Sequence, residues 1–313
     1  MTELKAGVIG VGYLGRFHAQ KYAAQSGVTL VGVADARAET AQKVAAELGC
    51  AAFTEYRELM AQVDLVSIAA TTETHYEIAR ACLEAGKHVL VEKPITVTVA
   101  EAEELARIAR ERGLKLQVGH IERFSPVWRA VEGRIGQPMF IEAHRMAPFK
   151  PRGIDVSVVL DLMIHDIDLV LNKVDSPIAE LRANGASVLT DRTDIANARI
   201  EFENGCTANL TASRVSLGVM RKMRLFQADG YLSIDFQERR VTFGRKAENP
   251  AEGEAPITSE VIEVPAGDAL MSEVSAFVES VQAGSRPVVA GEDGKRALEV
   301  ALEVNRQIES RRK

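Results

Sequence analysis

An acid and a histidine stand four residues apart in an apolar stretch just past the middle of the chain. Asp161 and His165 would share one face of a helix, because residues four apart lie about one turn from each other. A carboxylate beside an imidazole can fix its tautomer and raise its basicity, which suits a general acid or base. Asp168, seven residues after Asp161, falls near the same face. Taken alone, this spacing also describes a buried helix with one paired histidine.

Lys93 is a second candidate for chemistry, placed between Glu92 and Pro94 at the end of the apolar run 88–92. Pro94 biases the residue before it toward extended backbone. An ammonium group at a strand end can stabilise negative charge that develops on a substrate oxygen. The alternative is a surface lysine before a helix, which is the commoner fate of lysines. The strands and helices around Lys93 decide between the two.

The N-terminal stretch has the pattern of a dinucleotide site. An apolar strand at 6–10 runs into Gly10-Val-Gly12-Tyr-Leu-Gly15 and a helix, and the next strand ends at Asp35, twenty residues after Gly15. Gly10 permits a tight turn, Gly12 lets backbone approach a pyrophosphate, and Gly15 lets helix pack on strand. The helix N-terminus then offers N–H groups to phosphates. Asp35 is placed to accept hydrogen bonds from ribose hydroxyls.

The acid after the second strand also favours one dinucleotide over the other. A carboxylate at Asp35 would repel a 2′-phosphate, so we expect NAD rather than NADP. Arg37 could weaken the preference for NAD by pairing with a 2′-phosphate, or could simply be an exposed residue at a helix start. Further residues expected on the cofactor side are Tyr13, Leu14, Thr71, His75, Glu92 and Lys93 itself.

Strands and helices alternate through the first part of the chain, and hairpins replace them later. The alternation predicts a parallel sheet with ligands beyond the strand C-termini, the edge at which Lys93 would lie. After residue 121, short strands are separated by tight-turn signals such as Asn204-Gly205 and Asp229-Gly230. We therefore expect an α/β Rossmann domain at 1–120 and an α+β domain at 121–313 with an open, mostly antiparallel sheet. The C-terminal helix at 294–311 is able to pack back on the first domain.

Composition excludes several classes of function. The 313 residues are 46% hydrophobic and 26% charged, with a net charge of -6, which argues against general nucleic-acid binding. No run is long enough for a transmembrane helix, and Met1 leads directly into a strand, so we expect no signal peptide. Three scattered cysteines without metal-ligand spacing predict reduced thiols in a cytoplasm.

A basic cluster follows the strand at 140–145. Arg145, Lys150 and Arg152 lie close together in sequence, and Arg123 could join them in space. Guanidinium groups bind phosphates bidentately, so the cluster would suit a diphosphate in the substrate. A solvated loop is an equally good reading. His120 is a further substrate-side candidate, although a histidine at a strand end is as often structural.

These motifs together resemble those of the Gfo/Idh/MocA oxidoreductases. The resemblance rests on the glycine pattern, on Glu92-Lys93-Pro94 and on Asp161-x-x-x-His165, and it covers essentially the whole chain. It implies that Lys93, Asp161 and His165 are catalytic, and that the substrate is a sugar, a sugar nucleotide or a cyclitol. It also implies a homodimer or homotetramer through the second-domain sheet. One departure is Thr72, where relatives often have proline.

A narrower resemblance concerns the substrate. The run 118–124 and the run 151–156 before Asp161 look like those of a subgroup of UDP-N-acetylglucosamine 3-dehydrogenases. The resemblance implies oxidation of a secondary hydroxyl of a sugar nucleotide to a 3-keto sugar. Alternatives from the same family are an inositol or free-sugar dehydrogenase and an NAD-dependent glycosidase. A non-catalytic NAD-binding sensor is a different class, against which the intact Lys93, Asp161 and His165 count.

The residues leave the immediate base open between Lys93 and His165. His165 would take the hydroxyl proton, Asp161 would orient it, and Lys93 would stabilise charge on the oxygen or join the relay. A metal site built from Asp161, His165 and Asp166 is disfavoured, because Asp166 would point away from its neighbour on a helix. We therefore expect no metal.

Overall fold

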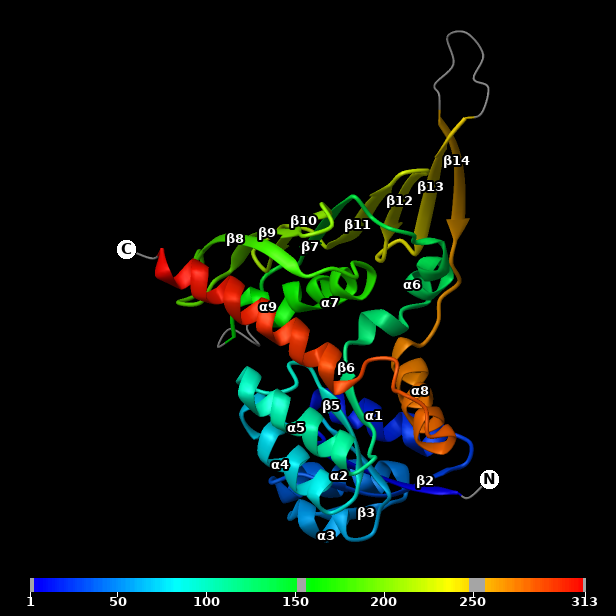
Figure 1. Cartoon of the computed structure of the whole chain (residues 1–313). Helices are drawn as coiled ribbons and strands as arrows, with labels where there is room; N and C mark the ends of the chain where they lie inside the picture. The colour runs from blue at the N-terminus through cyan, green and yellow to red at the C-terminus, as the bar shows by residue number, and fades with distance from the viewer. Residues whose placement is uncertain (1–2, 151–155, 248–256, 312–313) are drawn as a thin grey trace. The chain divides into compact units, whose positions relative to one another are not determined.

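The chain divides into two compact units. The computed structural model describes residues 3–150, 156–247 and 257–311. The first unit comprises Met1–Phe124 and Asp268–Leu298, and the second comprises Ser125–Gly267 and Glu299–Lys313. The chain thus leaves the first unit after Phe124 and returns to it at Asp268, whereas the sequence suggested two consecutive domains. Each unit is built on a sheet of its own (Figure 1).

A parallel sheet of six strands forms the centre of the first unit. Its order is β3-β2-β1-β4-β5-β6, and each neighbouring pair is parallel. The chain reverses its direction of strand addition between β1 and β4, which is where parallel sheets of this kind bind ligands. The strands are β1 (Leu4–Ile9), β2 (Val28–Ala34), β3 (Ala51–Phe53), β4 (Leu65–Ile68), β5 (His88–Glu92) and β6 (Leu116–Gly119).

Helices alternate with these strands. They are α1 (Tyr13–Ala24), α2 (Ala38–Leu48), α3 (Tyr56–Met60), α4 (Thr72–Glu84) and α5 (Val99–Glu111), and the turn η1 (Ile121–Phe124) follows β6. A reciprocal capping box of Thr98 and Glu101 starts α5. Gly49, with a φ of 68°, ends α2 in the left-handed conformation that glycine adopts at little cost. Figure 1 shows α4 and α5 side by side.

A late segment of the chain completes the core of the first unit. Helix α8 (Ala269–Ala283) contributes Val274, Phe277 and Val278 to the hydrophobic cluster that also contains Val8 and Tyr22. Helix α9 (Gly291–Ser310) begins in the first unit and ends in the second. Burying three large apolar side chains stabilises a fold by roughly 1.5–3 kcal/mol each. The first unit therefore depends on residues synthesised long after residue 124.

The second unit is built on a sheet of eight strands in the order β14-β13-β12-β11-β7-β10-β9-β8. Its neighbouring strands are antiparallel except for β7 and β10, which are parallel. Helix α7 (Ile164–Lys173) lies along one face near β7 and β10 (Figure 1). The strands are β7 (Phe140–Met146), β8 (Ile178–Ala186), β9 (Ile195–Phe202), β10 (Thr207–Ser213), β11 (Met220–Gln227), β12 (Gly230–Asp235), β13 (Arg240–Lys246) and β14 (Ile257–Glu263).

The predicted fold class is confirmed, since a Rossmann sheet is followed by a mostly antiparallel one. Some local elements differ. The strand β3, which is three residues long, has no counterpart among the elements expected from the sequence. Two short helical segments of the second unit, α6 (Pro126–Val131) and η2 (Glu132–Arg134), were also missed. These segments are too short or too polar to show a hydrophobic period.

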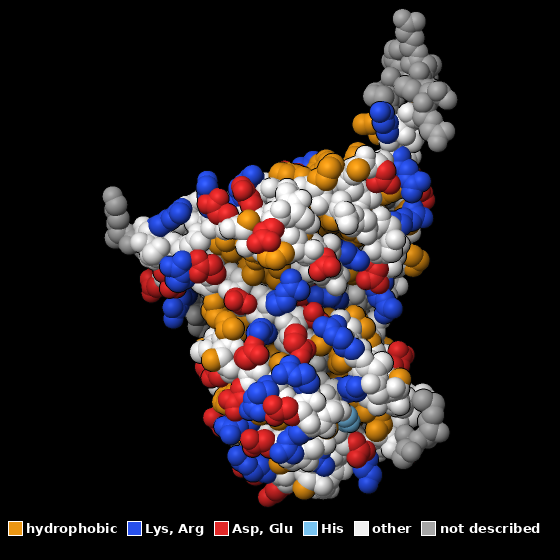
Figure 2. Space-filling view, in the orientation of Figure 1, with side chains coloured by type: hydrophobic (Ala, Val, Ile, Leu, Met, Phe, Trp, Pro, Cys, Tyr) orange, Lys and Arg blue, Asp and Glu red, His pale blue; other side chains and the backbone are white. Residues whose placement is uncertain are grey.

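Charged side chains of both signs are interspersed over the face of the molecule shown in Figure 2. That face lacks the broad positive field typical of nucleic-acid-binding proteins. Among the described residues, no helix has the length and apolar character needed to cross a membrane.

Candidate active site

The turn between β1 and α1 requires two of its glycines for reasons internal to the protein. Gly10 has a φ of +80°, and a Cβ there would lie 2.6 Å from the backbone nitrogen of Ala70. A Cβ on Gly15 would collide with the carbonyl oxygen of Gly10. A Cβ on Gly12, in contrast, would meet nothing within 4 Å. The packing of the chain therefore explains Gly10 and Gly15, and Gly12 leaves open space where a ligand can approach the backbone.

Asp35 is tied to this turn by its carboxylate. One carboxylate oxygen accepts a hydrogen bond from the Val11 N–H at 3.0 Å, and the other accepts one from the Arg37 N–H at 3.0 Å. The Asp35 side chain is 10% exposed, whereas that of Arg37 is 73% exposed. The carboxylate is therefore fixed in direction, and the guanidinium, 3.5 Å from it, stands in solvent.

A cavity of about 570 Å³ opens at this edge of the first sheet. Five residues predicted on the cofactor side line it, namely Gly10, Gly12, Asp35, Arg37 and Thr71. Helix α1 begins at Tyr13, and its N-cap residue, Gly12, has no side chain that could accept a hydrogen bond from the first N–H groups of the helix. An uncapped helix start beside a glycine with open space fits a pyrophosphate. The cavity thus suits a dinucleotide.

The remaining cofactor-side predictions lie next to the cavity lining rather than in it. Tyr13 and Leu14 begin α1 with side chains that are 65% and 48% exposed. His75 is buried, and its two ring nitrogens contact the carbonyl oxygens of Pro94 at 2.9 Å and Ala70 at 3.1 Å. His75 thus joins the loop after β4 to the turn that carries Lys93. It supports the site through backbone rather than by facing the cavity.

Lys93 lies in a turn directly after β5. Its backbone N–H donates to a carboxylate oxygen of Glu92 at 3.2 Å, and the Lys93–Pro94 peptide bond is cis. The other carboxylate oxygen of Glu92 contacts Nε2 of His18 at 2.9 Å. The sequence did not single out His18. Its position three residues after Gly15, on the sheet-facing side of α1, was the available signal.

Asp161 and His165 lie on a helix of changing pitch in the second unit. Asp161 falls in a π-helical turn, η3 (Val159–Met163), which continues directly into α7 with His165 in its first turn. The Ile164 N–H donates to the carbonyl oxygen of Val159, five residues earlier. Such π-helical turns are rare and are often found at functional sites. Asp161 and His165 are partly exposed, whereas the neighbouring Asp166 is buried.

The structure gives Arg145 a role other than the one expected. Its Nε and one terminal nitrogen donate to the two carboxylate oxygens of Asp166 at 2.9 and 2.7 Å, and both side chains are buried. A guanidinium engaged by both carboxylate oxygens in this way joins β7 to α7, so Arg145 is not available as a diphosphate ligand. His120 and Arg123 are buried around the start of η1 in the first unit. Arg152 lies outside the described residues.

Comparison with known proteins identifies the family. A model described as "Oxidoreductase family, NAD-binding Rossmann fold" matches residues 4–120, and one described as "GFO/IDH/MocA C-terminal domain" matches residues 129–233. The chain belongs to the GFO/IDH/MocA oxidoreductase family. The family expected from the motifs is thereby confirmed. The chain is an oxidoreductase of the NAD-binding type, and its curated relatives include dehydrogenases that are named for sugar and cyclitol substrates.

Similarity within the GFO/IDH/MocA family is uneven. A UDP-N-acetylglucosamine 3-dehydrogenase from Acidithiobacillus ferrooxidans is 43% identical over 99% of this chain and 99% of its own. A solved structure under the same enzyme name and organism matches with a TM-score of 0.92, at 41% identity over 99% of both chains. A myo-inositol 2-dehydrogenase from Thermotoga maritima is 27% identical over 99% of this chain and 97% of its own.

Proposed function

We propose that this chain is an NAD-dependent dehydrogenase that oxidises the 3-hydroxyl of UDP-N-acetylglucosamine to a ketone. The observation that carries the proposal is the 43% identity, over 99% of both chains, to an enzyme named for that reaction. Identity to the myo-inositol 2-dehydrogenase over a similar span is 27%. The difference favours a sugar nucleotide over a free cyclitol.

The choice of NAD over NADP is supported by Asp35. Its carboxylate lines the cavity and is held in place by two backbone N–H groups. A fixed negative charge there accepts hydrogen bonds from a ribose diol and repels a 2′-phosphate. Arg37 lies 3.5 Å from it and is mostly exposed, so it offers a weakly held counter-charge.

Three side chains carry the chemistry in this proposal. The dinucleotide, when bound, supplies the hydride acceptor. His165 takes the proton of the substrate hydroxyl, and Asp161, one turn earlier, orients the imidazole. Lys93 stabilises the negative charge that grows on the oxygen as the ketone forms. Arg123 and Arg152 remain the proposed ligands of the diphosphate, with His120 on the substrate side.

The test is a substrate panel with purified protein and NAD. NADH formation is followed by absorbance with UDP-N-acetylglucosamine, N-acetylglucosamine, glucose and myo-inositol, with an aminotransferase and glutamate present to remove the ketone. We expect turnover with the UDP sugar alone. Turnover with inositol or a free sugar instead would discard the sugar-nucleotide substrate and keep the dehydrogenase. NAD binding without net NADH would instead favour a glycosidase or a sensor.

The same panel includes two lysine variants. Lys93→Ala should bind NAD normally and lose at least about a hundredfold in kcat, because one oxyanion-stabilising group is typically worth a factor of this size. Lys43→Ala removes an exposed lysine from α2 and should match the wild type. Near-normal turnover of Lys93→Ala would contradict the role given to Lys93.

We also propose that the enzyme is a cytoplasmic homodimer or homotetramer that associates through the sheet of the second unit. Helix α7 packs near β7 and β10 of this sheet, and along β9 and most of β10 buried residues alternate with exposed or partly exposed ones. The cysteines Cys50, Cys82 and Cys206 are free thiols, which suits a reducing compartment. Light scattering coupled to size-exclusion chromatography measures the oligomer directly.

A further inference from the structure

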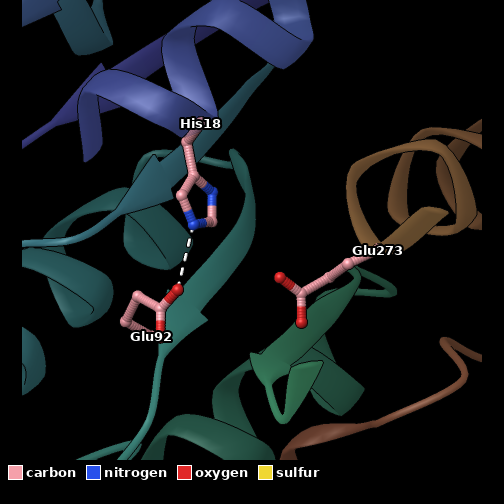
Figure 3. Close-up of side chains that lie close together, drawn as sticks. All are labelled: His18, Glu92 and Glu273. Atoms are coloured by element: carbon pink, nitrogen blue, oxygen red, sulfur yellow. Dashed lines mark hydrogen bonds and ion pairs between the residues drawn. The ribbon is translucent and has the colours of Figure 1, made fainter. Parts of the chain in front are cut away.

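Three buried ionisable side chains meet next to the Lys93 turn. His18 comes from α1, Glu92 from the end of β5 and Glu273 from α8, and Figure 3 shows the three pointing toward a common centre. One nitrogen or oxygen atom from each lies within 4.8 Å of the others. His18 is 1% exposed and Glu273 is 0% exposed. Ionised groups in such a place are costly unless compensated, so the positions of the protons decide what the cluster does.

Hydrogen bonds hold both ring nitrogens of His18. The Tyr22 hydroxyl lies 2.9 Å from Ser67 Oγ, which lies 3.2 Å from His18 Nδ1, and His18 Nε2 lies 2.9 Å from Glu92. Within the described part of the chain, the buried Tyr22 hydroxyl can donate to Ser67 alone. Ser67 Oγ has one proton and two lone pairs, so it can hold Nδ1 as well as Tyr22. An ionised Glu92 carboxylate can only accept, so Nε2 is the nitrogen that donates to it.

Glu92 is the ionised member of the pair of acids. Burial tends to raise the pKa of its carboxyl, but the hydrogen bond from His18 and the charge and N–H of Lys93 hold that pKa below its ordinary value. One carboxylate oxygen thus serves His18 and the other serves the Lys93 backbone. The Lys93 turn is anchored to the sheet through this carboxylate.

Glu273 is in the opposite situation. Neither of its carboxyl oxygens receives a hydrogen bond from any residue that the structure describes. Gln117 on β6 donates to the backbone oxygen of Glu273 at 3.1 Å, and the side-chain oxygen of Gln117 also lacks a described partner. Burial, followed by the charge of Glu92, raises the pKa of the Glu273 carboxyl well above its ordinary value. A buried carboxyl group without hydrogen-bond donors is less costly in its neutral form than as a carboxylate.

We propose that Glu273 is a positioning residue of the dehydrogenase reaction, acting as a buried neutral acid whose ionisation at alkaline pH disturbs the Glu92 carboxylate that anchors the Lys93 turn. A second negative charge within 4.8 Å would repel the Glu92 carboxylate, whose two oxygens hold His18 and the backbone N–H of Lys93. The proposal rests on the role given to Lys93 above.

Charged groups other than Glu92 also lie on the elements that pack against α8. Helix α8 packs on α1 and η1, and Lys21 of α1 pairs with Asp268 at the start of α8 at 2.6 Å. The titratable and charged side chains on the neighbouring elements and in the loops beside them are Tyr13, Arg16, His18, Lys21, Tyr22, Glu92, Lys93, His120, Glu122 and Arg123. Glu92 is the charge that raises the Glu273 pKa, and Glu273 in turn helps to raise that of Tyr22.

A divalent cation is the competing occupant of the cluster, since two carboxylates and an imidazole can ligate one. Binding would require His18 Nε2 to lose its proton. The hydrogen bond that joins Nε2 to Glu92 would then be lost. The metal content of the purified protein distinguishes a shared proton from a metal ion.

The test compares Glu273→Gln with Glu279→Gln, which is the same change at an exposed position of the same helix. We measure kcat and KM for NAD and the sugar nucleotide from neutral to alkaline pH. Glu273→Gln should keep neutral-pH kcat within about twofold and lose the alkaline decline of the wild type, with KM unchanged. Glu279→Gln should keep that decline. An identical alkaline decline in both variants, or a large loss of kcat in Glu273→Gln at neutral pH, would overturn the proposal.

Two measurements stand apart from turnover, so failure of the proposed substrate does not obscure the result. The infrared carbonyl band of a neutral carboxylic acid should be present in the wild type and absent in Glu273→Gln. Because the folded pKa of Glu273 is raised, its contribution to stability is full below the pKa of an unfolded glutamate and is lost as pH rises through the folded value. Glu273→Gln should therefore flatten the alkaline fall in Tm. A stoichiometric metal ion in the wild type that is lost in Glu273→Gln would also overturn the proposal.

Discussion

Single residues of the site combine a ligand role with a role in the fold. Asp35 is the clearest case, because the oxygens that face the cavity also accept the N–H groups of Val11 and Arg37. Losing such a buried acceptor costs a fold about 1–3 kcal/mol. A substitution at Asp35 is therefore expected to change both cofactor preference and stability, and the two effects have to be separated.

Asp35→Asn removes the charge and keeps the size of the side chain. We expect the ratio of kcat/KM for NADP to that for NAD to rise at least about tenfold, which corresponds to about 1.4 kcal/mol of relieved repulsion. Steady-state kinetics with each dinucleotide measures the ratio, and the denaturation midpoint reports the loss of stability. Adding Arg37→Ala should reduce the gain if Arg37 contacts the 2′-phosphate. An unchanged ratio in Asp35→Asn would show that another group selects the dinucleotide.

Site residues that belong to a short sequence motif could be predicted, whereas those that pair with residues far away in the chain could not. Gly10, Gly12 and Asp35 follow from a spacing that one strand, one turn and one helix enforce, and the structure places them around one cavity. The pairing of His18 with Glu92 joins residues 74 positions apart, and no local pattern encodes it. The sequence did contain a signal for Glu273, because an acid four residues before Phe277 lies on the apolar face of its helix.

At the scale of elements, the turn between β1 and α1 separates two uses of glycine. Gly15→Ala should destabilise the first unit, because its Cβ would collide with the Gly10 carbonyl. Gly12→Ala should fold normally, because its Cβ meets no protein atom, and should weaken dinucleotide binding at least about tenfold. Circular dichroism melts and NAD titration measure the two effects. Normal NAD affinity in Gly12→Ala would mean that the pyrophosphate binds elsewhere.

The helix that carries Asp161 and His165 could be predicted from the sequence, but its π-helical turn could not. A four-residue spacing puts both side chains on one side of a helix, and this much could be predicted. The π-helical turn at Val159–Met163 could not, because one extra residue in a turn leaves the apolar pattern almost unchanged. The buried pair of Arg145 and Asp166 was also hidden, since charged residues on a strand and a helix are exposed by default.

At the scale of the whole molecule, the first unit is built from two separate segments of the chain and is expected to need both of them to fold. A shortened chain of residues 1–124 lacks Val274, Phe277 and Val278 from its core. We expect it to bind a hydrophobic dye and to melt without cooperativity. Residues 1–124 joined by a short linker to residues 268–298 should melt cooperatively and bind NAD. Cooperative melting of the shorter chain would show that α8 is dispensable.

The discontinuity of the first unit also sets the order of events during synthesis. Residues 1–124 leave the ribosome early, but helix α8, which packs into their core, emerges only after the whole of residues 125–267. At ~5–20 residues per second, the delay is on the order of ten seconds. During that interval the nascent Rossmann sheet carries an uncovered apolar surface that chaperones can bind, and the eight-stranded sheet gains its last strand before α8 is made. Translation speed across the middle of the message is therefore a determinant of yield.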